Sequence, residues 1–405
     1  MQRLVITGMG AICALGNDAP SVWKAMTEGR TGIAPITRVA PELMRAGGVV
    51  AEVKDFDSAA YFDEAKLSQL DLATQYALVA AGEAVRQSGL VFEGERAMRT
   101  AVVVGSGVAG ESTRDVQYHK LYAENASRLH PLGIIRMMMN APASQISMAH
   151  GITGPSFVVA SACASSNHAF AQAAMMIRSG LVDAAVVGGT EGCLTLGTLR
   201  AWEAMRVLAP DTCRPFSAGR RGIVLGEGAG MFVIETLEQA QARGATILAE
   251  LAGAGMSSDA GDIAAPSEIG AAAAMAAALR DGQLSPSEID YVSAHGTGTL
   301  ANDATETAAL HRVFGEHARA LAISSTKPMH GHALGASGAL ELVAVIGALR
   351  DGIVPPTLGY LERDPVCDLD YVPNEVRRMP VHAAISNSFA FGGLNAVVAL
   401  RRIDP

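Results

Sequence analysis

Short apolar runs that end in small residues recur along the whole of this 405-residue chain. Helical patterns lie between several of the runs, and strands that alternate with helices build layered sheets covered by helices. The sequence therefore predicts an α/β fold. Eight strand-like runs carry this prediction: Leu4–Thr7, Ala101–Val104, Phe157–Val159, Ala184–Val187, Met231–Ile234, Tyr291–Ser293, Ala384–Ser386 and Ala396–Leu400.

A glycine pattern near the N-terminus recurs past the middle of the chain. Gly8 and Gly10 follow the first apolar run, and Gly253 and Gly255 follow a similar run at Ile247–Leu251. A helix-rich segment comes after each pair of glycines. We therefore expect an internal duplication whose joint lies near residue 250.

This joint divides the chain into an N-terminal half, residues 1–250, and a C-terminal half, residues 251–405. No low-complexity tract or flexible linker separates them, so we expect two similar halves of one large body. Residues 111–150 lack a clear strand-like run. They are expected to form a helical excursion that acts as a cap or contacts another subunit.

The composition excludes several classes of function. The net charge is −9 and no long basic run occurs, which argues against nucleic acids and anionic membranes as partners. The chain also lacks signal-peptide organisation and an apolar run of membrane-spanning length. Its five cysteines are scattered without a CxxC pair, a pattern typical of a reducing compartment. We expect a cytoplasmic protein, and 49% hydrophobic residues suggest that an oligomer buries part of its surface.

Cys163 lies at a junction between a strand and a helix. The run Phe157–Val159 gives way to small residues, and the helical pattern of Ala169–Ser179 follows and ends at Gly180. A thiol at the first turn of a helix lies in the positive end of the helix dipole, which favours the thiolate. A free cysteine is nevertheless more often a buried structural residue. Both interpretations of Cys163 stay open on this segment alone.

Histidines occur in two loops that are far apart in the sequence. His295 follows a strand-like run and is followed by Gly296 and Gly298, so it is either a structural histidine or a catalytic one. His330 and His332 alternate in the second loop, as ligands of a zinc ion would. No carboxylate or cysteine with ligand spacing lies near them, which argues against zinc.

Two glycine motifs allow a functional or a plain structural interpretation. Gly105–Gly110 matches the dinucleotide fingerprint GxGxxG, but the second strand with an acidic end that a nucleotide site needs is missing. Close packing is the better explanation for these glycines. Asn387–Asn395 contains Phe391 and two glycines, so it either forms a hairpin bend or aims backbone N–H groups at an oxyanion.

Together the Cys163 junction, the two histidine loops and the segment Asn387–Asn395 resemble the active-site set of the thiolase-like β-ketoacyl synthases, in particular the elongating synthases of dissociated fatty-acid and polyketide systems. The resemblance runs from Val5–Gly10 to Asn387–Asn395. It implies a thiolase-like five-layered α-β-α-β-α fold built from two duplicated halves. It further implies no intrinsic cofactor and no metal, since the substrates are carried on the phosphopantetheine of acyl carrier protein. The expected assembly is a homodimer, or a heterodimer with a chain-length-factor-like homologue.

The resemblance implies that Cys163 is the nucleophile that accepts the acyl chain as a thioester. The backbone N–H groups of Cys163 and Phe391 would hold the oxyanion of the tetrahedral intermediate. Phe391 is also expected to gate the entry of the second substrate, as its counterpart in the family does.

The same resemblance implies roles for four residues of the C-terminal half. His295 and His332, as neutral imidazoles, would donate hydrogen bonds to the enolate oxygen that forms when malonyl-acyl carrier protein loses carbon dioxide. Lys327 matches the active-site lysine of the family, and Glu341 is its expected ionic partner. We expect this pair to have electrostatic and orienting roles.

Lys66 and Arg206 match positions at which the family docks its acidic carrier protein. Relatives often have several basic residues near residues 63–69, where this chain has one lysine. Housekeeping enzymes also usually have other residues at the positions of Pro328, His330 and Leu394. These departures favour a specialised polyketide or polyene synthase, with a housekeeping fatty-acid enzyme as the alternative.

Two related classes fit the sequence less well. Thiolases use a second cysteine near the C-terminus as a base, and Cys367 lies outside any such motif. Chain-length-factor subunits lack the nucleophile, which is present here as Cys163. The chain is therefore expected to be an acyltransferase.

Overall fold

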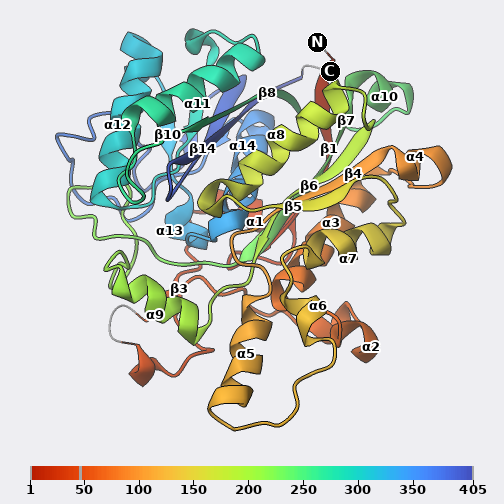
Figure 1. Cartoon of the computed structure of the whole chain (residues 1–405). Coiled ribbons are helices and arrows are strands. Elements are labelled where there is room, and N and C mark those ends of the chain that lie inside the picture. Colours follow the sequence, from red (N-terminus) through yellow and green to blue (C-terminus); the bar gives the residue numbers. More distant parts are fainter. Residues whose placement is uncertain (1, 45–47, 404–405) are drawn as a thin grey trace.

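A computed structural model describes residues 2–44 and 48–403 of the chain (Figure 1). Ten of the strands in this part form one mixed sheet, and four short strands form two separate pairs. The strands are β1 (Leu4–Cys13), β2 (Ala34–Pro35), β3 (Val49–Val50), β4 (Thr100–Gly105), β5 (Ser156–Val159), β6 (Ala184–Glu191), β7 (Gly228–Thr236), β8 (Ala249–Ser258), β9 (Tyr291–Ser293), β10 (Ala322–Ser324), β11 (Ile353–Val354), β12 (Arg377–Arg378), β13 (Ala383–Ala390) and β14 (Leu394–Arg401).

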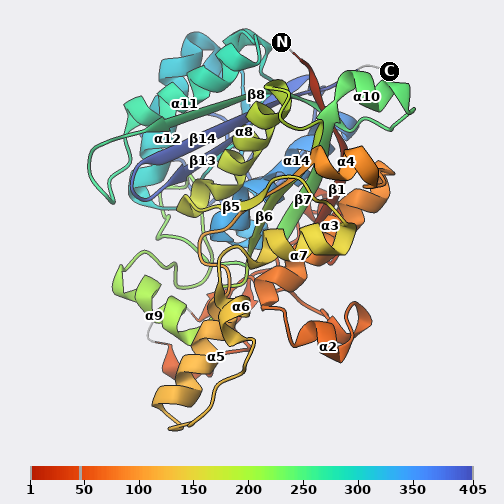
Figure 2. The same cartoon turned by 45° about the vertical axis from the view of Figure 1, so that its right-hand side comes forward.

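The α-helices surround this sheet on both faces and also lie between its two halves (Figures 1 and 2). They are α1 (Ala19–Thr27), α2 (Glu64–Leu67), α3 (Leu72–Ser88), α4 (Gly94–Met98), α5 (Glu111–Tyr122), α6 (Gly133–Met137), α7 (Ala141–His150), α8 (Ser165–Arg178), α9 (Leu196–Ala204), α10 (Leu237–Ala242), α11 (Glu268–Asp281), α12 (Leu300–Phe314), α13 (Lys327–His330) and α14 (Ser337–Asp351).

The large sheet repeats one strand order in its two halves. From the outer edge to the centre, the first half reads β5-β4-β6-β7-β1 and the second reads β10-β9-β13-β14-β8. When the five strands that each half contributes to the large sheet are numbered along the chain, both halves have the order third, second, fourth, fifth and first. The two halves meet where β1 and β8 pair in antiparallel register, with Leu4 opposite Leu251. The duplicated α/β architecture expected from the sequence is confirmed.

Two helices form the middle layer of the molecule. Helix α8 contacts β4 and β6 of its own half as well as β8 and β14 of the other, and α14 likewise contacts strands of both halves. Helices α3 and α11 cover the outer faces of the two halves. Residues 337–349 of α14 are all buried, and most of them are apolar, as expected for a helix in the middle of the molecule. The layers therefore follow the order α-β-α-β-α, and α8 and α14 lie at its centre.

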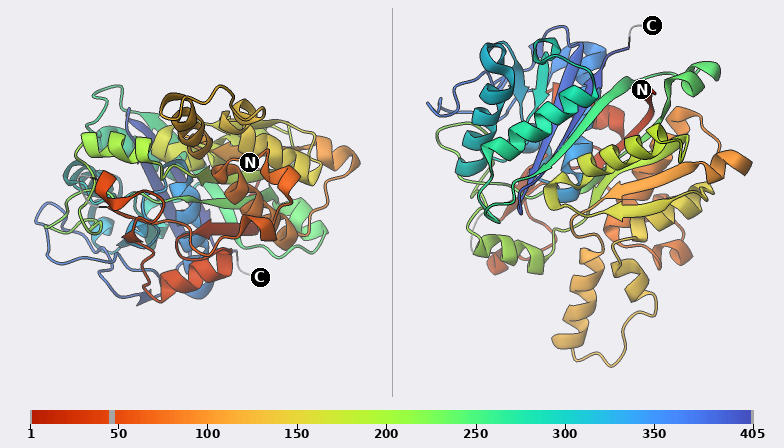
Figure 3. Two further views of the ribbon diagram at one scale, coloured as in Figure 1. Left: turned by 90° about the horizontal axis from the view of Figure 1, so that it is seen from below. Right: turned by 45° about the horizontal axis from the view of Figure 1, so that its top comes forward.

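An arm extends from the first half of the molecule (Figure 3). It contains α5, α6 and the loop between them, within the segment in which the sequence predicts a helical excursion. Several large apolar side chains of this segment are exposed: Val116, Tyr118, Leu121, Tyr122, Leu129, Ile134, Ile135, Met138 and Met148. Among residues 2–44 and 48–403, no helix has both the length and the hydropathy needed to cross a membrane.

Candidate active site

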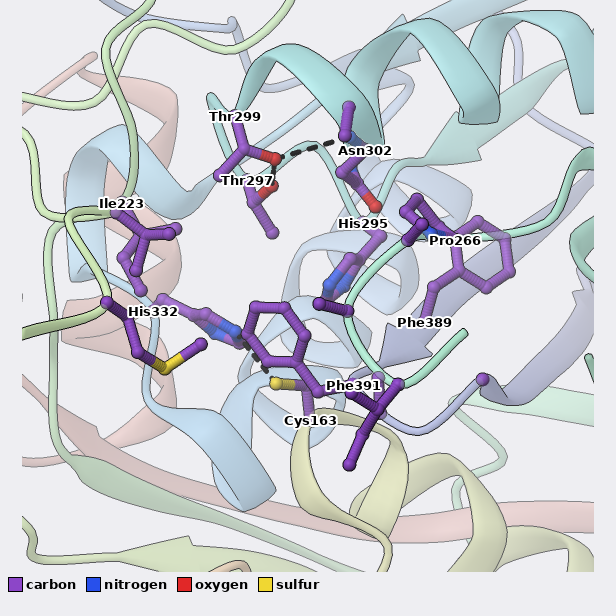
Figure 4. Close-up of a pocket in the computed structure, with 18 of the residues that line it drawn as sticks. Cys163, Ile223, Pro266, His295, Thr297, Thr299, Asn302, His332, Phe389 and Phe391 are labelled. Carbon is purple, nitrogen blue, oxygen red and sulfur yellow. Dashed lines mark hydrogen bonds between the residues drawn. The ribbon is translucent and has the colours of Figure 1, made fainter. Parts of the chain in front are cut away.

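The N-termini of α8 and α14, the two helices of the middle layer, lie close together, and a short turn precedes each helix. The 3₁₀ turns are Ala162–Ala164 before α8 and Leu334–Ala336 before α14. The first residue of each has a positive φ, +48° and +43° respectively, although neither is a glycine. Cys163 lies within the first turn and His332 lies just before the second. The internal duplication therefore brings these two side chains to equivalent ends of neighbouring helices (Figure 4).

The Sγ atom of Cys163 lies 3.1 Å from Nε2 of His332. Both side chains are buried. Burial raises the pKa of the Cys163 thiol to about 12, and the positive charge of Lys327 only partly opposes this. Burial therefore favours the thiol form of Cys163, whereas the start of a helix by itself favours the thiolate. Burial also lowers the pKa of His332 well below its usual value, so the imidazole is neutral.

His295 lies beside His332 at the end of β9, and their ring centroids are 5.5 Å apart. Glu306 holds the loop in place, because its carboxylate accepts hydrogen bonds from the backbone N–H groups of His295 and Gly296, each at 2.8 Å. Burial lowers the pKa of His295 well below its usual value, and the charge of Lys327 adds to the shift. The site therefore contains two neutral imidazoles next to one buried thiol.

Lys327 and Glu341 form a buried ion pair behind the histidines. The ammonium group also donates a hydrogen bond to the carbonyl oxygen of His295 and faces Nδ1 of the same residue at 3.5 Å. An ammonium group has donors and no acceptor, so it favours a lone pair on this Nδ1 and the proton on Nε2. Burial raises the pKa of Glu341 to about 7, and Lys327 opposes the shift. The expected ion pair is present, and it orients His295.

A cavity of about 250 Å³ leads from the surface to these side chains. Cys163, His295 and His332 lie at its buried end, and exposed apolar residues form its rim (Figure 4). Ile263 and Met205 belong to this rim. The remaining wall is also largely apolar, with Trp202, Val207, Ile223, Ala264, Ala265, Pro266, Ala301, Phe389, Ala390, Phe391 and Gly393 beside the polar Thr297, Thr299 and Asn302. A long, mostly apolar substrate arm can reach the thiol through this cavity.

Two residues that line the cavity, Cys163 and Phe391, have backbone N–H groups that are left without a protein acceptor in the described part of the chain. Among residues 2–44 and 48–403, the N–H groups of Cys163 and Phe391 donate to no other residue. Unpaired backbone donors next to a nucleophile are the usual means of stabilising an oxyanion. Their availability agrees with the role that the sequence predicts for them.

Phe391 lies in the hairpin turn between β13 and β14, where Ala390 pairs with Leu394. Gly392 and Gly393 have φ values of +84° and +70°, a region that favours glycine. Phe391 is 38% exposed, and the centroid of its ring lies 6.0 Å from that of Trp202. The segment is therefore a hairpin bend that also places an aromatic ring at the cavity.

The glycine motif that resembles a nucleotide site serves packing. A Cβ atom at Gly105 would lie 2.4 Å from the backbone of Ser165, so the end of β4 can approach the start of α8 only without a side chain. Gly110 has a φ of +85°, which a glycine adopts without strain. The structure confirms the close-packing interpretation.

Neither of the two predicted docking residues lines the cavity. Arg206 follows α9, is exposed, and adjoins the rim residue Met205. Lys66 lies on α2, and its ammonium group donates a hydrogen bond to Gln145 at 2.6 Å. Figures 1 and 2 show α2 and α9 on opposite sides of α5. Arg206 is thus the docking candidate that lies next to the entrance.

Several residues that shape the site have no role in the sequence-based prediction. Glu191 accepts hydrogen bonds from the N–H groups of Gly107 and Gly335, at 2.7 and 3.0 Å, and so ties β4 to the turn before α14. Burial raises the pKa of this carboxyl to about 7. Ser337 contacts His332. Glu191 is the last residue of β6 and Ser337 the first residue of α14. Many carboxylates and serines at such positions only cap or pack, so neither residue stands out in the sequence.

Comparisons with known proteins agree with this geometry. The family description "Beta-ketoacyl synthase, N-terminal domain" matches residues 1–240, and "Beta-ketoacyl synthase, C-terminal domain" matches residues 248–361. Nodulation protein E of Rhizobium sp. is 49% identical over 99% of this chain and 100% of its own length. The 3-oxoacyl-(acyl-carrier-protein) synthase 2 of Staphylococcus aureus is 38% identical over 100% of this chain and 99% of its own. The solved structure of the ishigamide ketosynthase/chain length factor superposes with a TM-score of 0.93 at 35% identity, over the full length of both chains.

Proposed function

This chain belongs to the β-ketoacyl synthase family, and on that premise we propose how its site condenses two carrier-bound acyl groups. The reaction is a decarboxylative Claisen condensation that lengthens an acyl chain by two carbons. One observation carries the assignment of the residues: Cys163 and His332 meet at 3.1 Å at the end of a cavity that His295 also lines. The N-terminal half, residues 1–250, supplies the nucleophile, and the C-terminal half, residues 251–405, supplies the imidazoles.

The first step transfers the acyl chain to Cys163. Its Sγ attacks the acyl thioester on the phosphopantetheine arm, the bond between the carbonyl carbon and the pantetheine sulfur breaks, and the thiol proton ends on that sulfur. The N–H groups of Cys163 and Phe391 hold the oxyanion in between. One thioester replaces another, so the step is readily reversible. The resting thiol is protonated, so its proton leaves as attack proceeds.

The second step makes the carbon nucleophile. Malonyl-carrier protein loses carbon dioxide, and the electrons of the broken C–C bond form an enolate. His295 and His332 donate hydrogen bonds to the enolate oxygen, which is why neutral imidazoles suit the site. The enolate carbon attacks the Cys163 thioester, the 3-oxoacyl chain leaves on the carrier protein, and the released thiolate takes a proton from water. Lys327 and Glu341 keep His295 in place.

Condensation is tested with an acyl-carrier protein and malonyl-carrier protein as the two substrates. We expect one carbon dioxide for each condensation and a product two carbons longer than the acyl substrate. Acyl exchange between thiols without loss of carbon dioxide would contradict the proposed reaction.

The carrier protein is proposed to dock over the cavity entrance, where Arg206 meets its acidic surface. Arg206→Glu is expected to raise the KM for malonyl-carrier protein about fivefold, because an exposed ion pair is worth about 1 kcal/mol. The kinetics of malonyl-pantetheine, which lacks the protein surface, should not change. Arg280→Glu, the same charge change on the remote helix α11, is the matched control. An equal effect of both variants on the carrier-protein KM would contradict docking at Arg206. Lys66, on the far side of α5, is proposed to make a second, separate contact.

A specialised pathway is the proposed setting of this reaction. The nodulation relative is 49% identical to the chain, against 38% for the 3-oxoacyl-(acyl-carrier-protein) synthase 2. Housekeeping enzymes usually have other residues at the positions of Pro328, His330 and Leu394, and this difference also favours a specialised enzyme. All five cysteines are free, which agrees with the proposed cytoplasmic location.

The protein is proposed to act as a dimer through the edge of its first half. In the part of the chain that the structure describes, strand β5 is an outermost strand of the large sheet and pairs only with β4, so its other edge offers unpaired backbone groups. The exposed apolar side chains of the arm lie in the same half. A second copy of the chain is the expected partner, with a particle twice the 41.8 kDa of one chain in light scattering. A monomer that is fully active would contradict this assembly, and a requirement for a homologous subunit would instead indicate a heterodimer.

A further inference from the structure

Ser337 is the first residue of α14, and its side chain is fully buried. Its Oγ lies 2.8 Å from Nδ1 of His332, on the side of the imidazole opposite Cys163. Among residues 2–44 and 48–403, this is the one hydrogen-bond partner of the hydroxyl group. The proposed mechanism assigns no role to Ser337, yet this residue contacts the ring whose other nitrogen faces the thiol.

The number of polar hydrogens on Ser337 and His332 decides which of the two side chains donates the hydrogen bond between them. A neutral imidazole carries one N–H, at either Nδ1 or Nε2. If Nδ1 carried the proton, the Ser337 oxygen would accept it, and the buried hydroxyl proton would then have no acceptor. A buried hydroxyl donor without a partner is costly, whereas a thiol is a weak donor that loses little when unpaired. The hydroxyl therefore donates to Nδ1, and the imidazole proton lies on Nε2, toward Sγ of Cys163.

The internal duplication provides an independent comparison. Ser165 occupies the equivalent position as the first residue of α8. Its hydroxyl accepts a hydrogen bond from the N–H of Ser161 at 2.9 Å and donates one to the carbonyl of Ala162 at 2.7 Å. Ser337 makes neither of these bonds in the second half, and its hydroxyl contacts the imidazole instead. The serine thus secures the local backbone in one half and the histidine in the other.

We propose that the Ser337 hydroxyl fixes His332 as the Nε2–H tautomer and that Ser337 is thereby a positioning residue for decarboxylation. The part about decarboxylation rests on the proposed function, whereas the tautomer does not. Only an imidazole with its proton on Nε2 can donate from the cavity side to an enolate oxygen. The residue touches neither substrate nor thiol and acts through the ring of His332.

The tautomer is read directly from ¹⁵N-histidine NMR of the full-length protein, with His332→Ala used to assign the signals. The expected spectrum has a protonated Nε2 and an unprotonated Nδ1 at His332. In Ser337→Ala the two shifts should move toward each other, because both tautomers become populated. Thr326→Val is the matched control, since Thr326 makes the equivalent 2.8 Å contact with His330, and it should leave the His332 signals in place. A protonated Nδ1 in the unaltered protein would overturn the proposal.

The effect on chemistry is measured as carbon dioxide release from malonyl-carrier protein in a Cys163→Gln background. Adding Ser337→Ala should lower the kcat of release about 10- to 100-fold, the range seen when a histidine ligand loses its orienting partner, with little change in KM. Ser337→Thr restores a hydroxyl and should recover most of the rate. An unchanged rate in Ser337→Ala would overturn the positioning role. If Cys163→Gln alone releases no carbon dioxide, the proposed function fails, and the spectrum still decides the tautomer.

Discussion

Replacing Cys163 with glutamine is expected to abolish condensation and leave decarboxylation of malonyl-carrier protein intact. Loss of a nucleophile that acts together with its partners costs on the order of 10⁵-fold or more in rate. The amide of glutamine cannot accept an acyl chain, so no acyl-enzyme forms. The enolate, in contrast, needs only the imidazoles, and these do not depend on the thiol for their positions. Product analysis and carbon dioxide release, measured on the same samples, separate the two steps.

Cys367→Ala is the control for this variant, because it removes another buried cysteine that lies outside the cavity. It should keep both activities. Residual condensation in Cys163→Gln at a rate near that of the unaltered protein would mean that another residue carries the acyl chain.

Replacing Lys327 with methionine is expected to destabilise the protein by about 3–5 kcal/mol, because Glu341 would then be a buried charge without a partner. The free energy of unfolding of this variant should also depend on pH, through the protonation of Glu341. Burial already raises the pKa of Glu341 to about 7, above its value in an unfolded chain, and removal of the cation raises it further. The folded variant then binds the extra proton more tightly than the unfolded chain does, so its stability falls as pH rises. The deficit should be greater at about pH 9 than at about pH 6.

A double variant distinguishes destabilisation by the unpaired charge from destabilisation by lost packing. Lys327→Met combined with Glu341→Leu leaves no unpaired charge, so most of the lost free energy of unfolding should return, as denaturant titration can measure. Decarboxylation should stay impaired, because His295 loses the ammonium group that orients it. Equal destabilisation in the single and double variants would contradict the ion pair as the cause.

The sequence was sufficient for the layered fold, and it named Cys163, His295 and His332 among the candidate residues that the structure brings together at the cavity. Cys163 was identifiable because it follows a strand-like run and precedes a helical pattern, which local propensity encodes. The role of His332 came from the resemblance to the β-ketoacyl synthases. The duplication was visible as a repeat of glycines near Gly8 and Gly253. The repeat of strand order in the sheet explains why these glycines recur.

What the sequence could not provide depends on contacts between distant segments. The pKa of Cys163 is set by burial among side chains from both halves, and a helix start alone does not reveal how much solvent is lost. Trp202 and Ile263 lie on loops and helices whose approach to the cavity is fixed only by the fold. Ser337 lies five residues from His332 in the chain, yet its contact depends on how the turn between them bends.

The central claim is that Cys163 holds the growing chain. Incubation with acyl-carrier proteins of graded chain length, followed by intact mass and peptide mapping, tests it most directly. We predict that one acyl group is added per chain and is found on the peptide that contains Cys163. An adduct on any other residue, or no adduct with any chain length, would contradict the account.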